Sequence, residues 1–361
     1  MKIIIAGGGT GGHLFPGIAI AEEFLRRDSG TAVLFIGTGK GLEKRILPGL
    51  GFPLKTMDIE GIKGKGIRKS FAALLKIPWS LVQASRMIRD FKPDIVIGVG
   101  GYASGPAVLA AHWMGIRTVI AEQNAIPGVT NRILGVFADR VFLSFPETRA
   151  WFRADKAVVS GNPVRPGFHE CGRREGKDRM FTVLIFGGSQ GARSINRAVA
   201  QALPHLREIS GTLQIIHQTG DRDLQFMENA YRAAGIHSEV LPFITDMMSA
   251  YSRADLLVCR AGATSIAEIT ACGKAAVLIP FPHAVNDHQT KNAEVLYHAG
   301  AAEMIHEKDL DGKRLADTIR RLHDDPGRIR AMEEKSAALG NIRAAETVVD
   351  ECMALMRRVK R

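Results

Sequence analysis

Residues 1–17 read MKIIIAGGGTGGHLFPG, a short apolar run followed by five glycines within the six residues 7–12 and then by His13. The apolar run predicts a buried strand, and the residues after the glycines predict a helix. Glycine lets the backbone adopt positive φ and lets a ligand approach the main chain. The N–H groups and the positive dipole end at the start of a helix favour an anion, most often a phosphate. This stretch therefore predicts a strand, a phosphate-binding turn and a helix.

A related pattern returns in the second half of the chain, where residues 182–193 read TVLIFGGSQGAR. Short β-branched runs alternate with helical patterns throughout, which predicts parallel sheets covered by helices. The predicted strands cover residues 2–6, 32–36, 95–99, 118–121, 140–143, 157–160, 182–186, 214–218, 238–241, 256–259 and 275–279. We therefore predict the α/β class, with two Rossmann-like domains whose parallel sheets face each other across a cleft. The turn-rich segment SGNPVR at 160–165 predicts the boundary, so that the domains cover residues 1–160 and 161–341.

The positive charge of the chain is concentrated in its first half. Residues 1–160 hold 21 Lys and Arg against 12 Asp and Glu, whereas the remaining residues hold 27 against 25. A basic first domain indicates an acidic partner, such as a nucleic acid, an anionic lipid surface or a phosphorylated substrate. The four cysteines show neither a CxxC pair nor a metal-binding spacing, so we expect free thiols. The uncharged segment 95–116 is interrupted by glycines and a proline, so we expect a strand, a loop and a helix in a soluble chain.

Gly7, Gly9 and Gly12 also match G-x-G-x-x-G, the fingerprint of dinucleotide-binding enzymes. That fingerprint requires an acidic residue about 20 positions further on, where the second strand ends. Here the second strand ends with FIGTG at 35–39, which holds no carboxylate. A nicotinamide enzyme is therefore not favoured. Two short D-x-D patterns, at 221–223 and 309–311, indicate surface carboxylates rather than a metal site.

A further glycine turn, GVGGYASGP at 98–106, would place a second set of backbone donors beside the first. A pyrophosphate could be held between the two turns, although tight packing of strands and helices also requires glycine. His13 follows the first turn directly and would reach a substrate hydroxyl, while isolated histidines are more often structural. After the fourth predicted strand, Glu122, Gln123 and Asn124 suit the recognition of a sugar or a hydroxyl.

In the second half, RAGATSIAE at 260–268 again follows a predicted strand and opens a helix. Thr264 and Ser265 supply hydroxyls at the N-terminus of that helix. Glu268 lies one turn further, where its carboxylate could accept two hydrogen bonds from a ribose diol or simply complement the helix dipole. The polar segment HAVNDHQ at 283–289 follows the next strand and could recognise a sugar.

Residues 61–89 contain seven Lys and Arg and no acidic residue. Within this segment Phe71, Leu74, Leu75, Trp79 and Val82 recur at helical spacing. A basic amphipathic helix is typical of an element that lies on a membrane surface. The same pattern equally suits an ordinary helix that packs on its own core.

Taken together, these segments resemble the MurG family of bacterial glycosyltransferases. The resemblance covers essentially the whole chain and rests on the motifs GGGTGGHLFPG, GVGGYASGP, EQNAIPG, SGNPVR, FGGSQGAR, RAGATSIAE and DHQTKNA, in this order. It implies the GT-B fold, with an acceptor- and membrane-binding N-terminal domain, a UDP-GlcNAc-binding C-terminal domain, and a last helix, 342–361, that packs on the N-terminal domain. The implied reaction is the inverting transfer of N-acetylglucosamine from UDP-GlcNAc to the C4 hydroxyl of undecaprenyl-pyrophosphoryl-MurNAc-pentapeptide in peptidoglycan synthesis. The implied location is peripheral, on the cytoplasmic face of the cell inner membrane.

The resemblance also implies roles for single residues. His13 would be the catalytic base, with Glu122 as the alternative. Ile244 would bind the uracil through its backbone, and Glu268 would bind the ribose. The substrate-binding set is Thr10, Gly11, Gly12, Asn124, Arg165, Ser189, Ile244, Ala263, Thr264, Ser265, Ile266, Ala267, Glu268 and Gln289. Phe71, Leu74, Leu75 and Trp79 would contact an anionic membrane surface; no metal, no cofactor and no nucleic acid are implied.

The same sequence features also suit other functions. Another GT-B enzyme, such as a glycolipid synthase or a UDP-GlcNAc 2-epimerase, would share the C-terminal motifs without needing the basic apolar segment 61–89. A nucleotide-sugar-binding membrane scaffold without activity is a further alternative.

Overall fold

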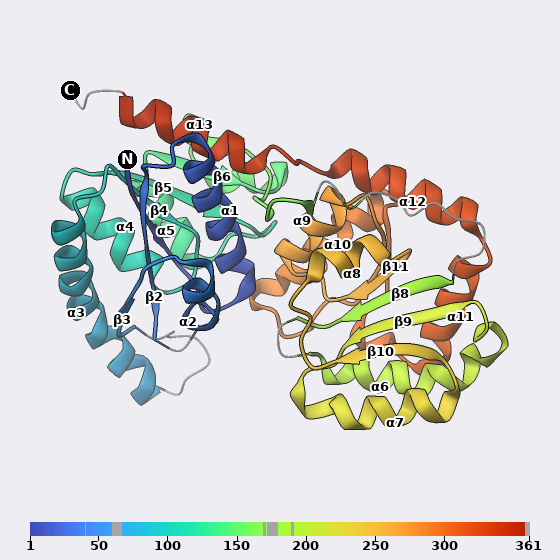
Figure 1. Ribbon diagram of the computed structural model, residues 1–361. Coiled ribbons are helices and arrows are strands. Elements are labelled where there is room, and N and C mark those ends of the chain that lie inside the picture. Colours follow the sequence, from blue (N-terminus) through green and yellow to red (C-terminus); the bar gives the residue numbers. More distant parts are fainter. Residues whose placement is uncertain (40, 60–66, 169–170, 172–179, 189–190, 358–361) are drawn as a thin grey trace. The chain divides into compact units, whose positions relative to one another are not determined.

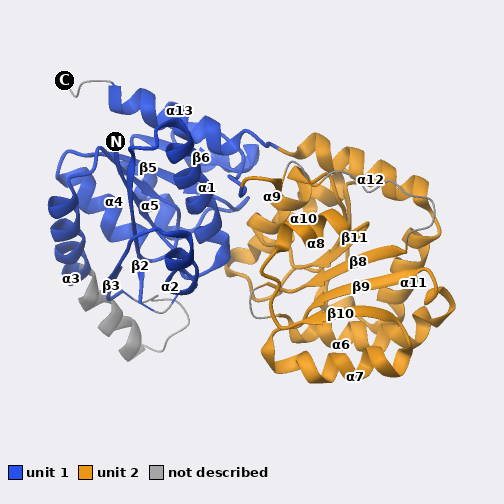
Figure 2. Cartoon of the chain, viewed as in Figure 1, with its two compact units in different colours: residues 1–165, 341–361 blue, residues 166–340 orange. Residues whose placement is uncertain are grey.

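The computed structural model describes residues 1–39, 41–59, 67–168, 171, 180–188 and 191–357, and of residues 67–77 it describes the backbone alone (Figure 1). The chain forms two compact units (Figure 2). Unit 1 contains Met1–Arg165 and Asn341–Arg361, and unit 2 contains Pro166–Gly340. The first break thus follows Arg165 rather than residue 160. The reason is that the Ser160 and Gly161 N–H groups still donate to the Leu143 carbonyl of unit 1, both at 3.1 Å.

Unit 1 is built on a parallel sheet of seven strands in the order β3-β2-β1-β4-β5-β6-β7. The strands are β1 (Lys2–Ala6), β2 (Ala32–Thr38), β3 (Leu54–Met57), β4 (Ile95–Gly98), β5 (Arg117–Glu122), β6 (Arg140–Leu143) and β7 (Ala157–Val159). Its helices are α1 (Gly11–Arg27), α2 (Glu43–Ile46), α3 (Ile67–Phe91), α4 (Ser104–Trp113), α5 (Val129–Phe137) and α13 (Ala344–Arg357), with 3-10 turns η1 (Leu47–Leu50) and η2 (Pro146–Trp151).

The central strand of unit 1 is buried on both faces, because β1 is apolar at every interior position. Ile3 and Ile5 pack toward α1 and α13, whereas Ile4 and Ala6 pack toward α3, α4 and α5. Helix α13 is therefore part of this core although it comes from the end of the chain: Val348, Val349, Cys352 and Leu355 are buried beside β1.

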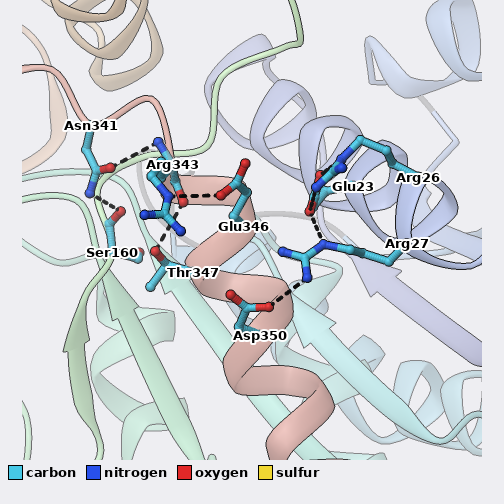
Figure 3. A network of polar contacts seen from close by, with 9 residues as sticks. All are labelled: Glu23, Arg26, Arg27, Ser160, Asn341, Arg343, Glu346, Thr347 and Asp350. Atoms are coloured by element: carbon cyan, nitrogen blue, oxygen red, sulfur yellow. Dashed lines mark hydrogen bonds and ion pairs between the residues drawn. The ribbon is translucent and has the colours of Figure 1, made fainter.

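Polar contacts hold α13 and the segment before it on unit 1 (Figure 3). The Asn341 side chain donates to the Ser160 carbonyl at 2.8 Å, and the Arg27 guanidinium of α1 lies 3.1 Å from the Asp350 carboxylate of α13. Arg27 also contacts Glu23, so one arginine joins carboxylates on two helices. The contact between α13 and the rest of unit 1 thus combines buried apolar side chains with polar contacts around them.

Unit 2 repeats the plan with a parallel sheet of six strands in the order β10-β9-β8-β11-β12-β13. The strands are β8 (Phe181–Phe186), β9 (Leu213–Gln218), β10 (His237–Leu241), β11 (Leu256–Cys259), β12 (Ala275–Leu278) and β13 (Ala302–Met304). The helices are α6 (Arg193–Ala202), α7 (Leu224–Ala234), α8 (Met247–Arg253), α9 (Ala263–Ala271), α10 (His288–His298), α11 (Gly312–His323) and α12 (Pro326–Leu339), with 3-10 turns η4 (Leu203–Ile209), η5 (Asp221–Asp223), η6 (Val285–Asp287) and η7 (Glu307–Asp309). Val183 and Ile185 of β8 pack with α6 and α11, while Phe186 contacts Tyr251 of α8 on the opposite face.

The predicted α/β class with two parallel sheets is confirmed, and every predicted strand is present. Two further strands, β3 and β13, were not predicted. Both are edge strands, and each has one buried residue, Met57 in LKTM and Ala302 in AEM, which is too little apolar pattern to indicate a strand. Within the described part of the chain, no helix has both the length and the apolar character that crossing a membrane requires.

Candidate active site

The two sheets place their glycine turns where ligands usually bind in this class of fold. In unit 1 the strand order reverses between β1 and β4, and in unit 2 it reverses between β8 and β11. Ligands of open α/β sheets bind outside the carboxyl ends of the strands at such a switch point. The turns that follow β1, β4, β8 and β11 are four of the segments that the sequence predicts to bind a ligand. The topology therefore gives each unit one candidate site.

The two glycine turns of unit 1 pack directly against each other. A Cβ atom on Gly7 would lie 2.6 Å from the Gly100 carbonyl oxygen, and one on Gly101 would lie 2.6 Å from the Gly8 carbonyl oxygen. These four glycines all have positive φ, between +80° and +157°. Tight packing is therefore a sufficient reason for glycine at these positions. It also brings the turn after β1 and the turn after β4 to one place.

Glu43, at the start of α2, forms hydrogen bonds with the first glycine turn. Its carboxylate accepts hydrogen bonds from the Gly9 N–H at 2.8 Å and from the N–H and hydroxyl of Thr38, both at 2.9 Å. The side chain is fully buried. A carboxylate does therefore lie at the end of the second strand, but it faces the backbone of its own unit and is not exposed to a ribose. Glu43 could not be predicted from the sequence, because a residue five positions beyond the strand gives no sign of folding back to it.

His13 lies in the first turn of α1, against the second glycine turn. Its Nδ1 is 3.2 Å from Oε1 of Gln123, and a Cβ atom on Gly100 would lie 2.5 Å from the same nitrogen. Gln123 itself is only 1% exposed. The interpretation of Gln123 as a sugar-recognising side chain is therefore wrong, because the amide faces His13 and the protein interior.

Glu122, the last residue of β5, is also buried and organises the loop that follows it. One carboxylate oxygen accepts from the backbone N–H and the side-chain amide of Asn124, at 2.9 and 3.2 Å. The other accepts from the Gly128 N–H at 3.0 Å and the Asn131 side chain at 2.9 Å. The predicted pair Glu122 and Asn124 is thus joined directly, and the carboxylate fixes the conformation of residues 124–131.

The remaining predicted residues of unit 1 lie around the start of α1. Thr10 precedes the helix with an extended backbone (φ −129°), and Gly11 and Gly12 form its first residues. Arg165 was predicted to belong to the second domain, but it lies in unit 1, where its guanidinium stacks 4.3 Å from the ring centre of Phe15 on α1. The stacking on α1 is the physical reason for the difference.

In unit 2, Gln218 at the end of β9 connects two predicted segments. Its side-chain amide donates to the Gly188 carbonyl at 2.7 Å, and its Oε1 accepts from the Ile244 N–H at 2.8 Å. The glycine turn after β8 and the backbone of Ile244 are therefore held at a fixed distance. Gly188 and Gly191 have positive φ. Ser189, predicted to bind substrate, lies outside the described residues.

A cluster of buried polar side chains lies next to the same glycine turn. The Asn196 amide of α6 donates to the Thr219 carbonyl at 2.9 Å, and its oxygen lies 3.1 Å from His217 Nε2. The other ring nitrogen of His217 is 2.9 Å from the hydroxyl of Tyr231. Burial lowers the pKa of His217 to about 3, so the ring is neutral at physiological pH. The Thr219 carbonyl in turn leaves no room for a side chain at Gly191.

Arg260 joins the turn after β11 to the rest of the unit 2 site. Its guanidinium donates to the carbonyls of Ile279 and Pro280, both at 3.1 Å, and to the Ser194 hydroxyl of α6 at 2.8 Å, and it also pairs with Glu307. Because Arg260 is buried and both of its Nη atoms have partners, it positions the ends of β11 and β12 relative to the start of α6.

The predicted residues 263–268 form the first turns of α9. The helix begins after Gly262, which has an extended backbone, and Thr264 and Glu268 are buried. Glu268 Oε2 accepts from the Tyr251 hydroxyl at 3.4 Å. Gln289, at the start of α10, accepts from the Phe281 N–H at 3.0 Å, so it fixes the end of β12.

The D-x-D carboxylates have structural partners within unit 2. Asp223 accepts from the Asn196 side chain at 2.8 Å, and Asp311 caps α11 by accepting from the Arg314 N–H at 2.7 Å.

The loop before α10 has an unusual backbone conformation, because Asn286 and Asp287 both have positive φ without being glycine. Non-glycine residues in the left-handed region cluster at active sites, ligand clamps and switch segments.

Comparison with known proteins assigns a family to both units. The model of the glycosyltransferase family 28 N-terminal domain matches residues 3–143, and that of the family 28 C-terminal domain matches residues 182–348. The chain belongs to glycosyltransferase family 28. Its two sheets, with their glycine turns at the switch points, are the two domains of this family.

Individual relatives agree with the family over the whole chain. A protein of Syntrophus aciditrophicus named UDP-N-acetylglucosamine--N-acetylmuramyl-(pentapeptide) pyrophosphoryl-undecaprenol N-acetylglucosamine transferase is 61% identical over 99% of this chain and 99% of its own length. A protein of the same name from Myxococcus xanthus is 49% identical over 99% of this chain and 93% of its own length. The crystal structure of Acinetobacter baumannii MurG superposes with a TM-score of 0.79 at 35% identity, over 98% and 99% of the two chains. A UDP-GlcNAc 2-epimerase from Neisseria meningitidis shares the fold, with a TM-score of 0.68 at 12% identity over 98% of this chain and 100% of its own.

The role of Glu43 leads to a testable prediction. In the variant Glu43→Gln, one of the two carboxylate oxygens becomes an NH₂ group that faces a backbone donor, so either the Gly9 N–H or the Thr38 N–H loses its acceptor. Leaving buried donors unsatisfied costs about 1–3 kcal/mol. We expect faster hydrogen exchange at whichever of Gly9 and Thr38 loses its acceptor, measured by NMR or mass spectrometry. The matched control is Glu147→Gln on the exposed turn η2, and equal exchange in both variants would contradict the role of Glu43.

Proposed function

We propose that this chain transfers N-acetylglucosamine from UDP-GlcNAc to the C4 hydroxyl of undecaprenyl-pyrophosphoryl-MurNAc-pentapeptide, the step from lipid I to lipid II in peptidoglycan synthesis. The observation that carries this function is 61% identity over 99% of the chain to a transferase with that name. The chain is thus a UDP-GlcNAc-dependent glycosyltransferase.

The chemistry requires one base and a stabilised leaving group. The C4 hydroxyl oxygen of the muramoyl sugar attacks the anomeric carbon of N-acetylglucosamine, and its proton passes to the base. The bond between that carbon and the β-phosphate oxygen breaks, and UDP leaves with the electron pair, so the configuration inverts. A helix N-terminus and backbone N–H groups stabilise the charge that develops on the pyrophosphate.

In unit 1 we assign the base to His13 rather than to Glu122. Both carboxylate oxygens of Glu122 accept hydrogen bonds from the loop 124–131, and the residue is buried, so it positions Asn124. His13 is half-buried at the start of α1, beside the turns that bind the acceptor pyrophosphate. Thr10, Gly11 and Gly12 complete this part of the substrate site.

In unit 2 the residues around the turn after β8 and the start of α9 bind UDP-GlcNAc. Ile244 binds the uracil through its backbone carbonyl, since its N–H already donates to Gln218. Glu268 binds the ribose, and Gln289 binds the sugar at the start of α10. The hydroxyls and N–H groups of Thr264 and Ser265, in the first turn of α9, suit the phosphates.

The activity is tested directly with the purified full chain. We expect UDP release from UDP-GlcNAc when the lipid-linked muramoyl-pentapeptide is added and no release without it, measured by a coupled UDP assay. We expect release to continue in EDTA, because the turn after β8 and the N-terminus of α6 would stabilise the leaving group. Donor binding without release would show that the acceptor is assigned wrongly, and acceptor-independent conversion of UDP-GlcNAc would indicate an epimerase.

The base assignment gives a second prediction. His13→Ala should lower kcat by about 10²- to 10⁴-fold, the usual contribution of a general base, and leave the affinity for UDP-GlcNAc unchanged. Rates are measured at saturating substrates, and donor binding by calorimetry. The control His205→Ala changes an exposed histidine of unit 2. Near-normal turnover of folded His13→Ala would remove this residue from the base role.

The outer surface of α3, α4 and α5 suits an anionic membrane. Trp79 is 52% exposed and Arg86 lies 5.9 Å from its ring centre. The neighbouring helices add Trp113, at 64% exposed, and Val136, at 67%. Helices α3, α4 and α5 pack side by side on one face of the unit 1 sheet, so these residues share one surface. The side chains of Phe71, Leu74 and Leu75 lie outside the described residues.

We propose that this surface places the enzyme peripherally on the cytoplasmic face of the cell membrane, where the lipid-linked acceptor is found. Apolar side chains enter the headgroup region, and nearby basic residues each add about 1 kcal/mol on an anionic surface. Trp113 and Val136 were not singled out from the sequence, because isolated apolar residues on two short helices give no amphipathic pattern.

The membrane proposal predicts the effect of two substitutions. Trp79→Glu and Trp113→Glu should each weaken binding to vesicles with anionic lipid by about tenfold or more, because each removes an aromatic side chain that would be buried. Binding is measured by co-sedimentation, with vesicles of neutral lipid for comparison. Phe226→Glu, at an exposed aromatic of α7 in unit 2, is the control. Unchanged binding of both tryptophan variants would contradict the proposal.

A further inference from the structure

Gln123 of unit 1 lies beside His13 and has no assigned role in the proposed transfer reaction. It follows β5, it is 1% exposed, and it therefore does not reach a substrate. Its Nε2 donates to the carbonyl oxygens of Val99 and Ala121, at 3.1 and 3.2 Å. Its Oε1 lies 3.2 Å from Nδ1 of His13. All polar atoms of this side chain thus have defined contacts.

These contacts fix which way the amide points. Two carbonyl oxygens can be bonded only by the NH₂ group, so the atom that faces His13 is the amide oxygen. An amide oxygen accepts and cannot donate. His13 Nδ1 must then be the donor, which means that the proton of the neutral ring is on Nδ1. In a neutral imidazole the other nitrogen, Nε2, then carries the lone pair.

We infer that Gln123 is a positioning residue that holds His13 in the tautomer with a basic Nε2, the form that can take the proton of the acceptor hydroxyl. This inference rests on the proposed role of His13 as the base. Neutral histidine in water favours the opposite tautomer, with the proton on Nε2, which cannot accept a proton there. A hydrogen bond at Nδ1 is the usual way in which proteins select the active form.

The sheet topology explains why Gln123 can reach His13. β4 lies between β1 and β5, so a side chain at the end of β5 must cross the end of β4 to approach α1. It does so by bonding the Val99 carbonyl, the first residue after β4. The ring of His13 lies against Gly100, where a Cβ atom would be 2.5 Å from Nδ1. The absence of a side chain at Gly100 therefore lets the ring approach the amide.

The elements around His13 also carry ionisable groups, but these make other contacts than the neutral amide of Gln123. Glu122 accepts hydrogen bonds from the backbone of the loop that follows it, and Glu43 accepts one from the Gly9 N–H of the first glycine turn. Tyr102, in the turn after β4, is exposed, and Arg165 stacks on the ring of Phe15 two positions from His13. The group hydrogen-bonded to Nδ1 is the neutral amide, so it selects a tautomer without adding charge.

The wild-type protein tests the inference without any substitution in the site. Histidine labelled with ¹⁵N is incorporated into the full chain, and the His13 signals are assigned by their loss in His13→Ala. At a pH at which the ring is neutral, we expect the proton on Nδ1 and an unprotonated Nε2. A proton on Nε2 in the wild-type protein would overturn the inference.

A variant then connects the tautomer with the rate. Gln123→Met keeps the length of the side chain and removes the acceptor, so we expect the proton to move to Nε2 and kcat to fall by about ten- to hundredfold, a part of the usual contribution of a base. KM for both substrates should stay within twofold. The matched control is Gln83→Met, which also removes an amide oxygen that accepts from a backbone N–H, that of Asp58.

The outcomes separate this inference from the proposed function. If His13→Ala keeps its turnover, the base role itself fails. If His13→Ala is inactive but Gln123→Met keeps full kcat, the base role stands and the inference about Gln123 is wrong. A merely structural role of Gln123 would lower stability and raise KM without changing the tautomer of His13 in the folded variant. If the variant does not fold, the tautomer of His13 in the wild-type protein decides the question.

Discussion

The contact between two glycine turns, at the carboxyl ends of β1 and β4, is the constraint on which unit 1 depends. Side chains at Gly7 or Gly101 would meet the carbonyl oxygen of the opposite turn at 2.6 Å. Only glycine lets two backbones approach so closely and adopt positive φ at the same time. This contact fixes where α1 begins, and the start of α1 fixes His13. The candidate base can therefore occupy this position because the glycines of the two turns carry no side chains.

Irregular turns of this kind leave backbone groups without partners in a sheet or helix, and buried polar side chains supply those partners. Glu43 and Glu122 accept from backbone N–H groups in unit 1, Gln218 bonds two segments in unit 2, and Arg260 donates to the ends of β12. An unsatisfied buried group costs about 1–3 kcal/mol, so each of these side chains stabilises a conformation that the backbone alone would not keep. These residues bond the backbone of the candidate sites and thereby determine the shape of the turns.

The sequence predicts what depends on local pattern and misses what depends on long-range contacts. Apolar runs and glycine turns identify the central strands and both switch points, because burial on two faces and positive φ are properties of a few adjacent residues. The direction of a side chain is different: Gln123 follows a strand directly and looks available to a sugar, yet it turns inward because Val99 and Ala121 offer carbonyls. Glu43 and Arg165 show the same limit, since their partners are Gly9 and Phe15, far away in the sequence.

The choice of an amide beside His13 agrees with the charge of the substrate. A carboxylate at Nδ1 would select the same tautomer, but it would add a negative charge next to the turns that we propose bind a pyrophosphate. It would also stabilise the protonated ring and so reduce the fraction of base that is present at neutral pH. A glutamine avoids both effects, because its oxygen is a hydrogen-bond acceptor without net charge. The two carboxylates nearby, Glu43 and Glu122, have their oxygens bonded to backbone N–H groups, which disperses their charge into the protein. The amide thus orients the candidate base without adding a charge beside the glycine turns.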